Sequence, residues 1–151
     1  MRKAVILFFL FVFISGCGNL APTDSQVNGP EDSLETVQGG QTLIFRALGF
    51  TVTNKDGVAL PDVEIEFFAG GTGILTNLNG NPLNPTSPGV FKTRTDDRGL
   101  ARVSYLITLP SCPAPVAGTT TADQTATGSV RGTVGSNSGH LWKATITIKC
   151  S

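Results

Sequence analysis

The side chains most able to do chemistry in this 151-residue chain are one histidine and three cysteines. His140, which ends the segment Ser136-Asn-Ser-Gly-His, could be set beside Ser138 and an aspartate as a nucleophilic triad. A triad is held by turns and strands from separate segments, and a histidine next to Gly and Ser carries no such constraint. We therefore interpret His140 as a solvent-exposed loop residue and predict that the protein is not an enzyme.

Zinc and nucleotide sites lack the residues that they need. With one histidine and no Cys-x-x-Cys pair, a zinc site would be short of ligands. The glycine-rich segments 70–73 and 128–132 lack the lysine and the following helix of a phosphate-binding loop. We expect no cofactor.

Oxygen-bearing side chains gather in two short segments, at Asn54 and Asp56 and at Asp96 and Asp97. One alternative is a calcium site at one end of the fold, since calcium takes about six to eight oxygen ligands. The other is that these side chains stabilise tight turns by bonding the local backbone. We favour the turn role and predict no metal.

An aromatic platform for carbohydrate would have to use Trp142 and Tyr105, the one tryptophan and the one tyrosine. Both fall on the apolar side of segments in which apolar and polar residues alternate. Such positions face a core. We therefore expect core packing for both.

An uninterrupted apolar run covers residues 5–14, preceded by Arg2 and Lys3 and followed by the small residues Ser15 and Gly16. A charged start, an apolar centre and a small-residue end are typical of a secretory signal peptide. The run is about half of the roughly 20 residues that a membrane-spanning helix needs. We expect residues 1–16 to be removed on export.

The segment Ile14-Ser-Gly-Cys17 resembles the lipobox of bacterial lipoproteins. The resemblance implies that Cys17 accepts diacylglycerol through its thiol and becomes the new N-terminus, so that the membrane is a partner through acyl chains. Gly18 and Asn19 follow the cysteine, which in this class implies the outer membrane where the cell has two membranes. The alternative is an ordinary secretory signal whose cleavage site happens to carry a cysteine.

Cys112 and Cys150 remain as a single possible pair once Cys17 is lipidated. Export would place them in an oxidising compartment, where a disulfide is the usual state of such a pair. The bridge would join two strand ends, because Cys112 follows the expected strand 101–107 and Cys150 ends another. We predict this disulfide, with two free buried thiols as the alternative.

Composition indicates one β domain with an appendage. Eleven basic residues balance eleven acidic ones, so no net field would steer the chain to nucleic acid, and a strongly basic nucleic-acid-binding protein is excluded. Charged residues make up 15% of the chain, and Gly, Pro, Thr and Val are frequent, as in β proteins with many turns. The length suits a single domain.

We interpret residues 17–33 as the lipidated N-terminus and a flexible linker, because they offer few apolar side chains to bury. Glu31, Asp32 and Glu35 are then solvated charges rather than a ligand patch. Beyond the linker, short apolar stretches alternate with turn signals and no window keeps a helical period. The sequence predicts an all-β domain over residues 34–151.

Alternation typical of half-buried strands marks residues 50–53, 62–67, 101–107 and 142–150. Asp56-Gly57 supports a hairpin between the first two. A further strand is plausible over residues 129–134. We expect loops over residues 70–89 and 117–128.

Segments 50–67 and 95–105 resemble the bacterial immunoglobulin-like domains of the invasin and intimin type. The matching residues are Asn54, Gly57, Pro61, Val63, Phe67, Thr95, Asp96, Gly99, Ala101 and Val103. The resemblance covers residues 34–150 and implies an immunoglobulin-like β-sandwich that serves as an interaction, adhesion or spacer module. It also implies an envelope or surface protein as partner. The motifs build turns and core, so they describe a scaffold and not an activity.

Two alternatives stay open. Similar Thr-Asp-x-x-Gly-x-Ala signals occur in transthyretin-like and carboxypeptidase-regulatory-like β domains. The domain could also be a polysaccharide-binding accessory module of an envelope hydrolase or secretion system. In the leading interpretation, a partner binds at edge strands or end loops, and in particular at residues 117–128.

Overall fold

The computed structural model describes residues 22–39, 42–79, 81–83, 89–114, 116–118, 120–136 and 138–150. The regular elements within these residues are β-strands. They are β1 (Gln26–Asn28), β2 (Ser33–Gln38), β3 (Thr42–Thr53), β4 (Glu64–Gly71), β5 (Ile74–Thr76), β6 (Val90–Arg94), β7 (Leu100–Thr108), β8 (Gln124–Val134) and β9 (Ser138–Lys149). Over the same ranges, no helix is long and apolar enough to cross a membrane.

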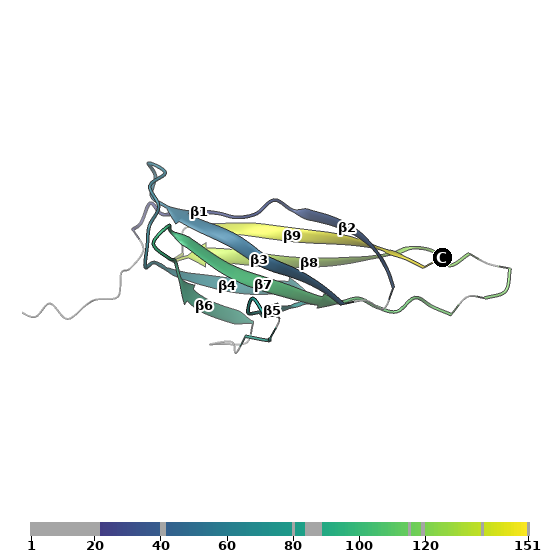
Figure 1. Cartoon of the computed structure of the whole chain (residues 1–151). Helices are drawn as coiled ribbons and strands as arrows, with labels where there is room; N and C mark the ends of the chain where they lie inside the picture. The colour runs from purple at the N-terminus through teal and green to yellow at the C-terminus, as the bar shows by residue number, and fades with distance from the viewer. Residues whose placement is uncertain are drawn as a thin grey trace, which may run out of the picture.

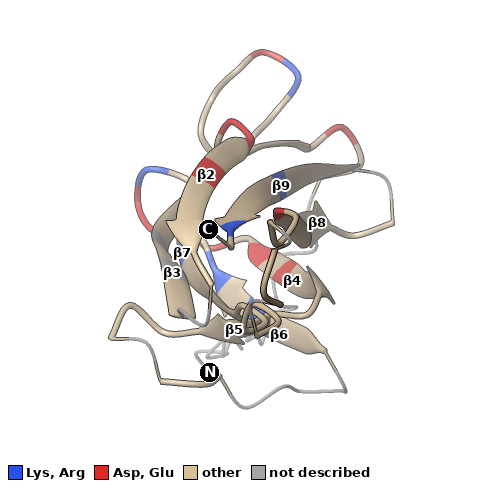
Figure 2. Cartoon of the chain, turned by 90° about the vertical axis from the view of Figure 1, so that its right-hand side faces the viewer, with Lys and Arg blue, Asp and Glu red and all other residues tan. Residues whose placement is uncertain are grey.

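The strands lie in two layers, seen from the side in Figure 1 and end-on in Figure 2. Sheet A has the strand order β1-β3-β7-β5, and sheet B has the order β2-β9-β8-β4-β6. Neighbouring strands run antiparallel, apart from β2 and β9, which run parallel. Two such sheets packed face to face are the architecture of immunoglobulin-like folds. The all-β sandwich predicted from the sequence is confirmed.

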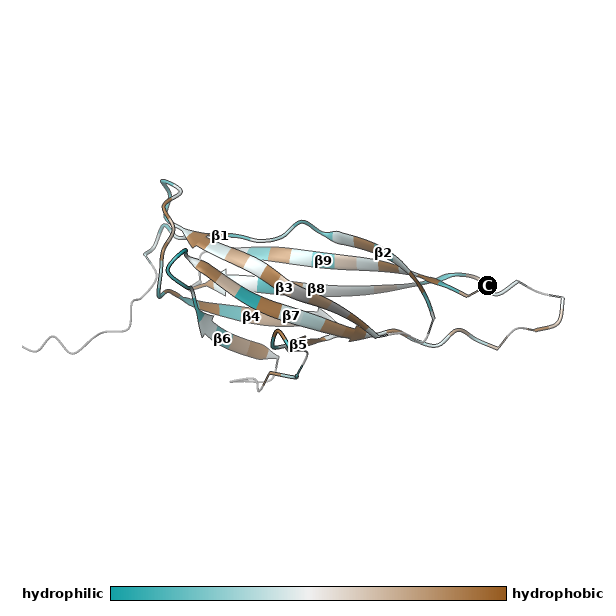
Figure 3. Ribbon diagram, viewed as in Figure 1, coloured by the Kyte–Doolittle hydropathy of each residue, from teal (hydrophilic) through white to brown (hydrophobic). Residues whose placement is uncertain are grey.

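Alternation along the strands places one face of each sheet in the core, which Figure 3 shows as bands of differing hydropathy. In β9, Trp142, Ala144, Ile146 and Ile148 are fully buried, as their spacing predicted. Further fully buried residues from both sheets are Phe50, Val52, Ile65, Phe67, Tyr105, Ile107 and Val130. Each square ångström of apolar surface buried contributes roughly 25 cal/mol, so this shared core is the main source of stability.

The Tyr105 hydroxyl is satisfied inside the core. It donates to the carbonyl of Gly70 at 2.6 Å and accepts from the N–H of Gly73 at 3.0 Å. Burial raises the pKa of this hydroxyl above its usual value. The ring lies so close to Gly128 that an added Cβ there would be 2.5 Å from it, and it contacts Trp142 edge-on. Neither aromatic side chain therefore forms an exposed carbohydrate platform.

The structured domain begins before residue 34. β1 pairs with β3, and Val27 is only 7% exposed and belongs to the core. The Asp32 carboxylate accepts the backbone N–H of Lys143 at 2.7 Å, next to the first pair of the β2–β9 ladder. The predicted linker, residues 17–33, therefore extends too far into the chain. The prediction missed β1 because a three-residue strand with one buried side chain gives no periodic signal.

The prediction of a loop over residues 117–128 is partly wrong. β8 begins at Gln124 and pairs with β9 along its whole length. Ala126 packs against the core, whereas Thr125 and Thr127 are exposed. The core-facing positions in this part of β8 are Ala126 and Gly128. Because both side chains are small, the segment lacks the strong apolar alternation on which the prediction depended.

The loop expected over residues 70–89 also contains strand. β5 pairs with β7, and Leu75 and Thr76 are buried. A tight turn follows, in which the side-chain oxygen of Asn77 accepts the backbone N–H groups of Asn79 and Asn81.

Candidate functional site

The two segments that carried the family resemblance meet at one end of the sandwich, where each forms the same turn. The side-chain oxygens of Asn54 and Asp96 accept the backbone N–H groups two and four residues further on, at 2.9–3.0 Å. The N–H groups of Leu100 and Arg98 thereby lower the pKa of the Asp96 carboxyl. Of the oxygens that a calcium site would use, those of Asn54 and Asp96 are engaged within their own turns. No group of three His, Cys, Asp or Glu in the described part of the chain could hold a metal ion.

Thr95 ties the two segments together. Its buried hydroxyl donates to the carbonyl of Leu60 at 2.7 Å and accepts the N–H of Val63 at 3.0 Å. Gly99, with φ of 70°, passes so close to Val52 that an added Cβ would be 2.7 Å from its carbonyl oxygen. These matched residues therefore build the joint between the sheets and do no chemistry.

His140 is not a loop residue, which corrects the expectation from the sequence. It lies in β9, and its Nε2 is 3.1 Å from the carbonyl oxygen of Pro30. Because a carbonyl can only accept, Nε2 carries a proton. The ring packs edge-on to Phe50, and a Cβ on Gly29 would come within 2.2 Å of it. His140 thus fixes the crossover from β1 in sheet A to β2 in sheet B.

Cys17, the expected lipidation site, lies outside the described residues. Cys112 and Cys150 are bonded to each other, with their Cα atoms 5.4 Å apart, and both pack against the core. Gly39 lies against this bridge, since an added Cβ would be 2.4 Å from the Cys112 sulfur.

The loop between β7 and β8, residues 109–123, is held at both ends. Its first part is tied to the end of β9 by the disulfide from Cys112 to Cys150. At its last residue, the Asp123 carboxylate pairs with the ammonium group of Lys149 and accepts the N–H of Cys150 at 3.4 Å. Lys149 also lowers the pKa of the Asp123 carboxyl. We call residues 109–123 the clamped loop.

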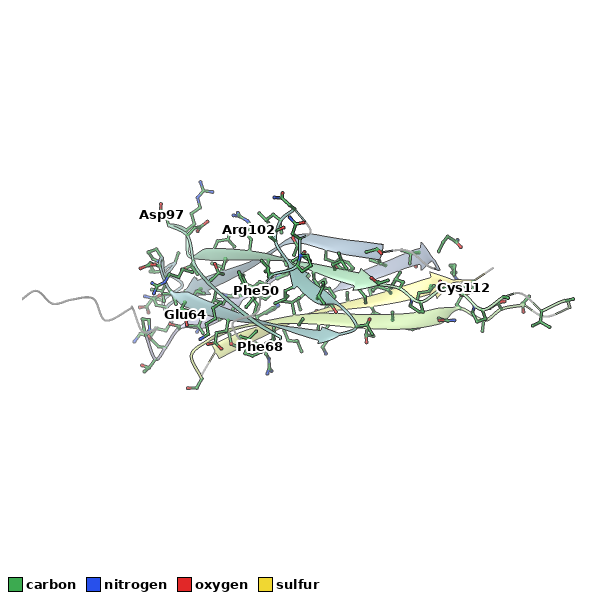
Figure 4. The ribbon with its side chains drawn as sticks, turned by 90° about the horizontal axis from the view of Figure 1, so that it is seen from below. Phe50, Glu64, Phe68, Asp97, Arg102 and Cys112 are labelled. Carbon is green, nitrogen blue, oxygen red and sulfur yellow. A yellow bond between two sulfur atoms is a disulfide. The ribbon has the colours of Figure 1, made fainter. Side chains whose placement is uncertain are left out.

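Between its two fixed points the clamped loop offers small, uncharged side chains. Residues 113–122 contain Pro, Ala, Val, Gly and Thr, and Val116 is 67% exposed. The loop projects from the end of the sandwich opposite the turns at Asn54 and Asp96. In Figure 4, Cys112 marks the end with the loop and Asp97 the end with the turns. β1 begins beside the last residue of β3, Thr53, so the N-terminal strand starts at the end that carries the turns.

An apolar pocket of about 300 Å³ lies between β4, β5 and β6. Its lining includes Ala69, Ile74, Leu75, Val90 and Phe91, and none of the described residues around it can titrate. The described lining of the pocket therefore offers no acid, base or nucleophile.

No family model matches this chain, and no curated protein matches it. Among solved structures, the PapD-like domain 7 of human CEP192 is 10% identical, with 100% of this chain and 98% of that chain covered and a TM-score of 0.44. A conjugative transposon lipoprotein from Bacteroides eggerthii DSM 20697 is 11% identical, with coverages of 83% and 97% and a TM-score of 0.41. At TM-scores below 0.5 these likenesses decide neither family nor function.

Proposed function

We propose that this chain is a bacterial envelope lipoprotein, lipidated at Cys17, whose immunoglobulin-like sandwich is a non-enzymatic module that binds another envelope protein. The clamped loop carries the proposal for the domain. Its residues 113, 114, 116–118, 120 and 122 are exposed, and the segment 113–122 is uncharged and fixed at both ends, so a partner that binds it orders little more of the chain.

The proposed localisation in the cell envelope is based on residues 1–17. The short apolar run followed by Ile14-Ser-Gly-Cys17 resembles a lipoprotein signal, and Gly18 and Asn19 favour the outer membrane in a cell with two membranes. The resemblance of segments 50–67 and 95–105 to invasin and intimin domains supports a role in adhesion or in assembly at the cell surface.

Lipidation is tested by metabolic labelling with a clickable fatty acid. The wild-type chain should take up label, and Cys17→Ala should not, because the thiol is the acceptor. Cys112→Ala is the matched control, since it removes a different cysteine and should retain the label. Equal labelling of wild type and Cys17→Ala would contradict lipidation at this position.

Binding through the loop is tested by replacing residues 113–122 with a Gly/Ser segment of equal length, which leaves Cys112 and Asp123 in place. Cross-linking pull-down from envelope fractions should lose the partner, while the midpoint of urea unfolding stays near that of wild type. Lys55→Ala, in the turn at the opposite end, should retain capture. Capture that survives the loop replacement would place the binding surface elsewhere.

A further inference from the structure

Two hollows meet on the side of the sandwich formed by β8. The first, of about 300 Å³, lies over β8 and β9 and is lined by Ser129 and Lys143. The second, of about 600 Å³, lies where the end of β7 approaches β8 and is lined by Thr108 and Thr125. Both are lined by Gly71 and Thr127, so they lie next to each other, and we call the two hollows together the trough.

The trough exists because the strands carry small side chains where they pass one another. Gly70 of β4 pairs with Ser129 of β8, which in turn pairs with Lys143 of β9. An added Cβ on Gly70 would be 2.4 Å from the Ser129 hydroxyl, so no larger side chain fits there. Gly71, which lines both hollows, has φ of 79° and likewise has no side chain to fill the space.

Hydroxyl groups make up most of the polar lining of the trough. They belong to Thr72, Thr108, Thr125, Thr127, Ser129 and Thr145. Each hydroxyl can both donate and accept, as the hydroxyl groups of a sugar can. Among the described residues, no carboxylate lines either hollow.

Two cations lie at one end of the trough: Lys143 lines it, and Arg131, which pairs with the lining residue Leu141, lies just beyond it. Lys143 and Arg131 lie diagonally across the β8–β9 pair, and neither forms an ion pair within the described residues. Elsewhere in sheet B the cations are neutralised: Lys92 by Glu64 and Glu66, Arg94 by Asp62 and Lys149 by Asp123. Neither side chain is therefore ion-paired within the described residues, and the Asp32 carboxylate beside Lys143 is held by the backbone N–H of that residue, so both cations can bind a negatively charged ligand.

Apolar side chains border the same two cations. Arg131 pairs with Leu141 on one side and with Phe68 on the other, and Leu141 is 40% exposed. Figure 4 shows Phe68 on the outer side of the sheet, away from Phe50 in the core. The pyranose ring of a sugar has apolar faces that such side chains can contact.

We propose that this trough binds an extended acidic polysaccharide. Its negatively charged groups bind Lys143 and Arg131, and its hydroxyl groups bind the threonine and serine side chains along β8. A polymer fits better than a single sugar, because two neighbouring hollows offer it two places of contact. This site goes beyond the proposed function and is separate from residues 113–122 of the clamped loop.

The test measures binding of the full chain in detergent to polygalacturonate, with its fully methyl-esterified form as the neutral match. The wild type should bind the acidic form, bind the ester much more weakly and lose affinity as salt rises. Replacing both cations, Arg131→Gln with Lys143→Gln, should weaken binding by roughly tenfold, because two charge-assisted contacts are lost. Lys55→Gln with Arg98→Gln removes the same charge in the two turns, outside the lining of the trough, and should have little effect.

A second variant tests the trough and not its charge. Thr127→Tyr places a large side chain where the two hollows meet, leaves the net charge unchanged and should also weaken binding to polygalacturonate. Equal binding of acid and ester, an equal loss in the control pair or full binding by Thr127→Tyr would each overturn the proposal. Partner capture measured in the same variants reports separately on the clamped loop, so the two proposals can fail independently.

Discussion

At the residue scale, Thr95 shows how one hydroxyl can join two strands that are far apart in the sequence. In Thr95→Val the shape is kept, but the carbonyl of Leu60 and the N–H of Val63 lose their partner in a buried position. We expect a loss of about 2–3 kcal/mol in the free energy of unfolding, measured by urea titration. Thr95→Ser keeps the hydroxyl and should cost clearly less. Equal losses in both variants would show that packing of the methyl group, and not the hydrogen bonds, matters here.

Asp96 makes stability depend on acid pH. Its pKa is lowered in the fold by the N–H groups of Leu100 and Arg98, so the ionised form is favoured over that in the unfolded chain. The stabilisation is therefore present above pH about 4, the unfolded value, and is lost as pH falls through the lowered folded value. Asp96→Asn keeps an oxygen acceptor, as Asn54 does in the matching turn, and removes the titration. Urea midpoints between pH 2 and 6 should then fall less steeply than in wild type, and an unchanged slope would assign the acid dependence to other carboxyls.

At the element scale, the crossover from β1 to β2 depends on a glycine that passes over a histidine ring. Gly29→Ala should lower the free energy of unfolding by roughly 1–3 kcal/mol, because its Cβ would overlap the ring of His140. In a His140→Ala background the same change should cost much less, since the obstructing ring is gone. A double-mutant cycle from chemical unfolding measures this coupling. Additive losses would show that the crossover does not pack as the structure describes.

At the scale of the whole molecule, the disulfide closes the chain between residues 112 and 150, a separation of 38. Loop-closure entropy predicts that Cys112→Ala with Cys150→Ala lowers the free energy of unfolding by about 4 kcal/mol. The sandwich should still form, because its core lies between the strands and not at the bridge. Circular dichroism and urea unfolding check both points. Loss of the β spectrum in the double variant would show that the bridge is needed for the fold itself.

The strands with strong alternation and the turns between them were predictable from the sequence. In β4, β7 and β9 the apolar residues stand at every second position, and in the turns at Asn54 and Asp96 the hydrogen bonds close within five residues. The cysteine pair was also predicted from the sequence, since a lipidated Cys17 leaves two thiols, and the structure shows the bond between them. Each of these features depends on a local sequence pattern or on the number of cysteines, so it could be predicted without the long-range contacts of the fold.

The place of β1, the full length of β8 and the role of His140 became clear only from the folded structure. Val27 is a single apolar residue whose burial depends on pairing with β3. Ala126 packs against the core, and Gly128 lies against the ring of Tyr105. The trough likewise arises where Gly70 passes beside Ser129, two residues 59 positions apart in the printed sequence. Short strands and small side chains carry almost no periodic signal, and their environment comes from long-range pairing that one sequence does not display.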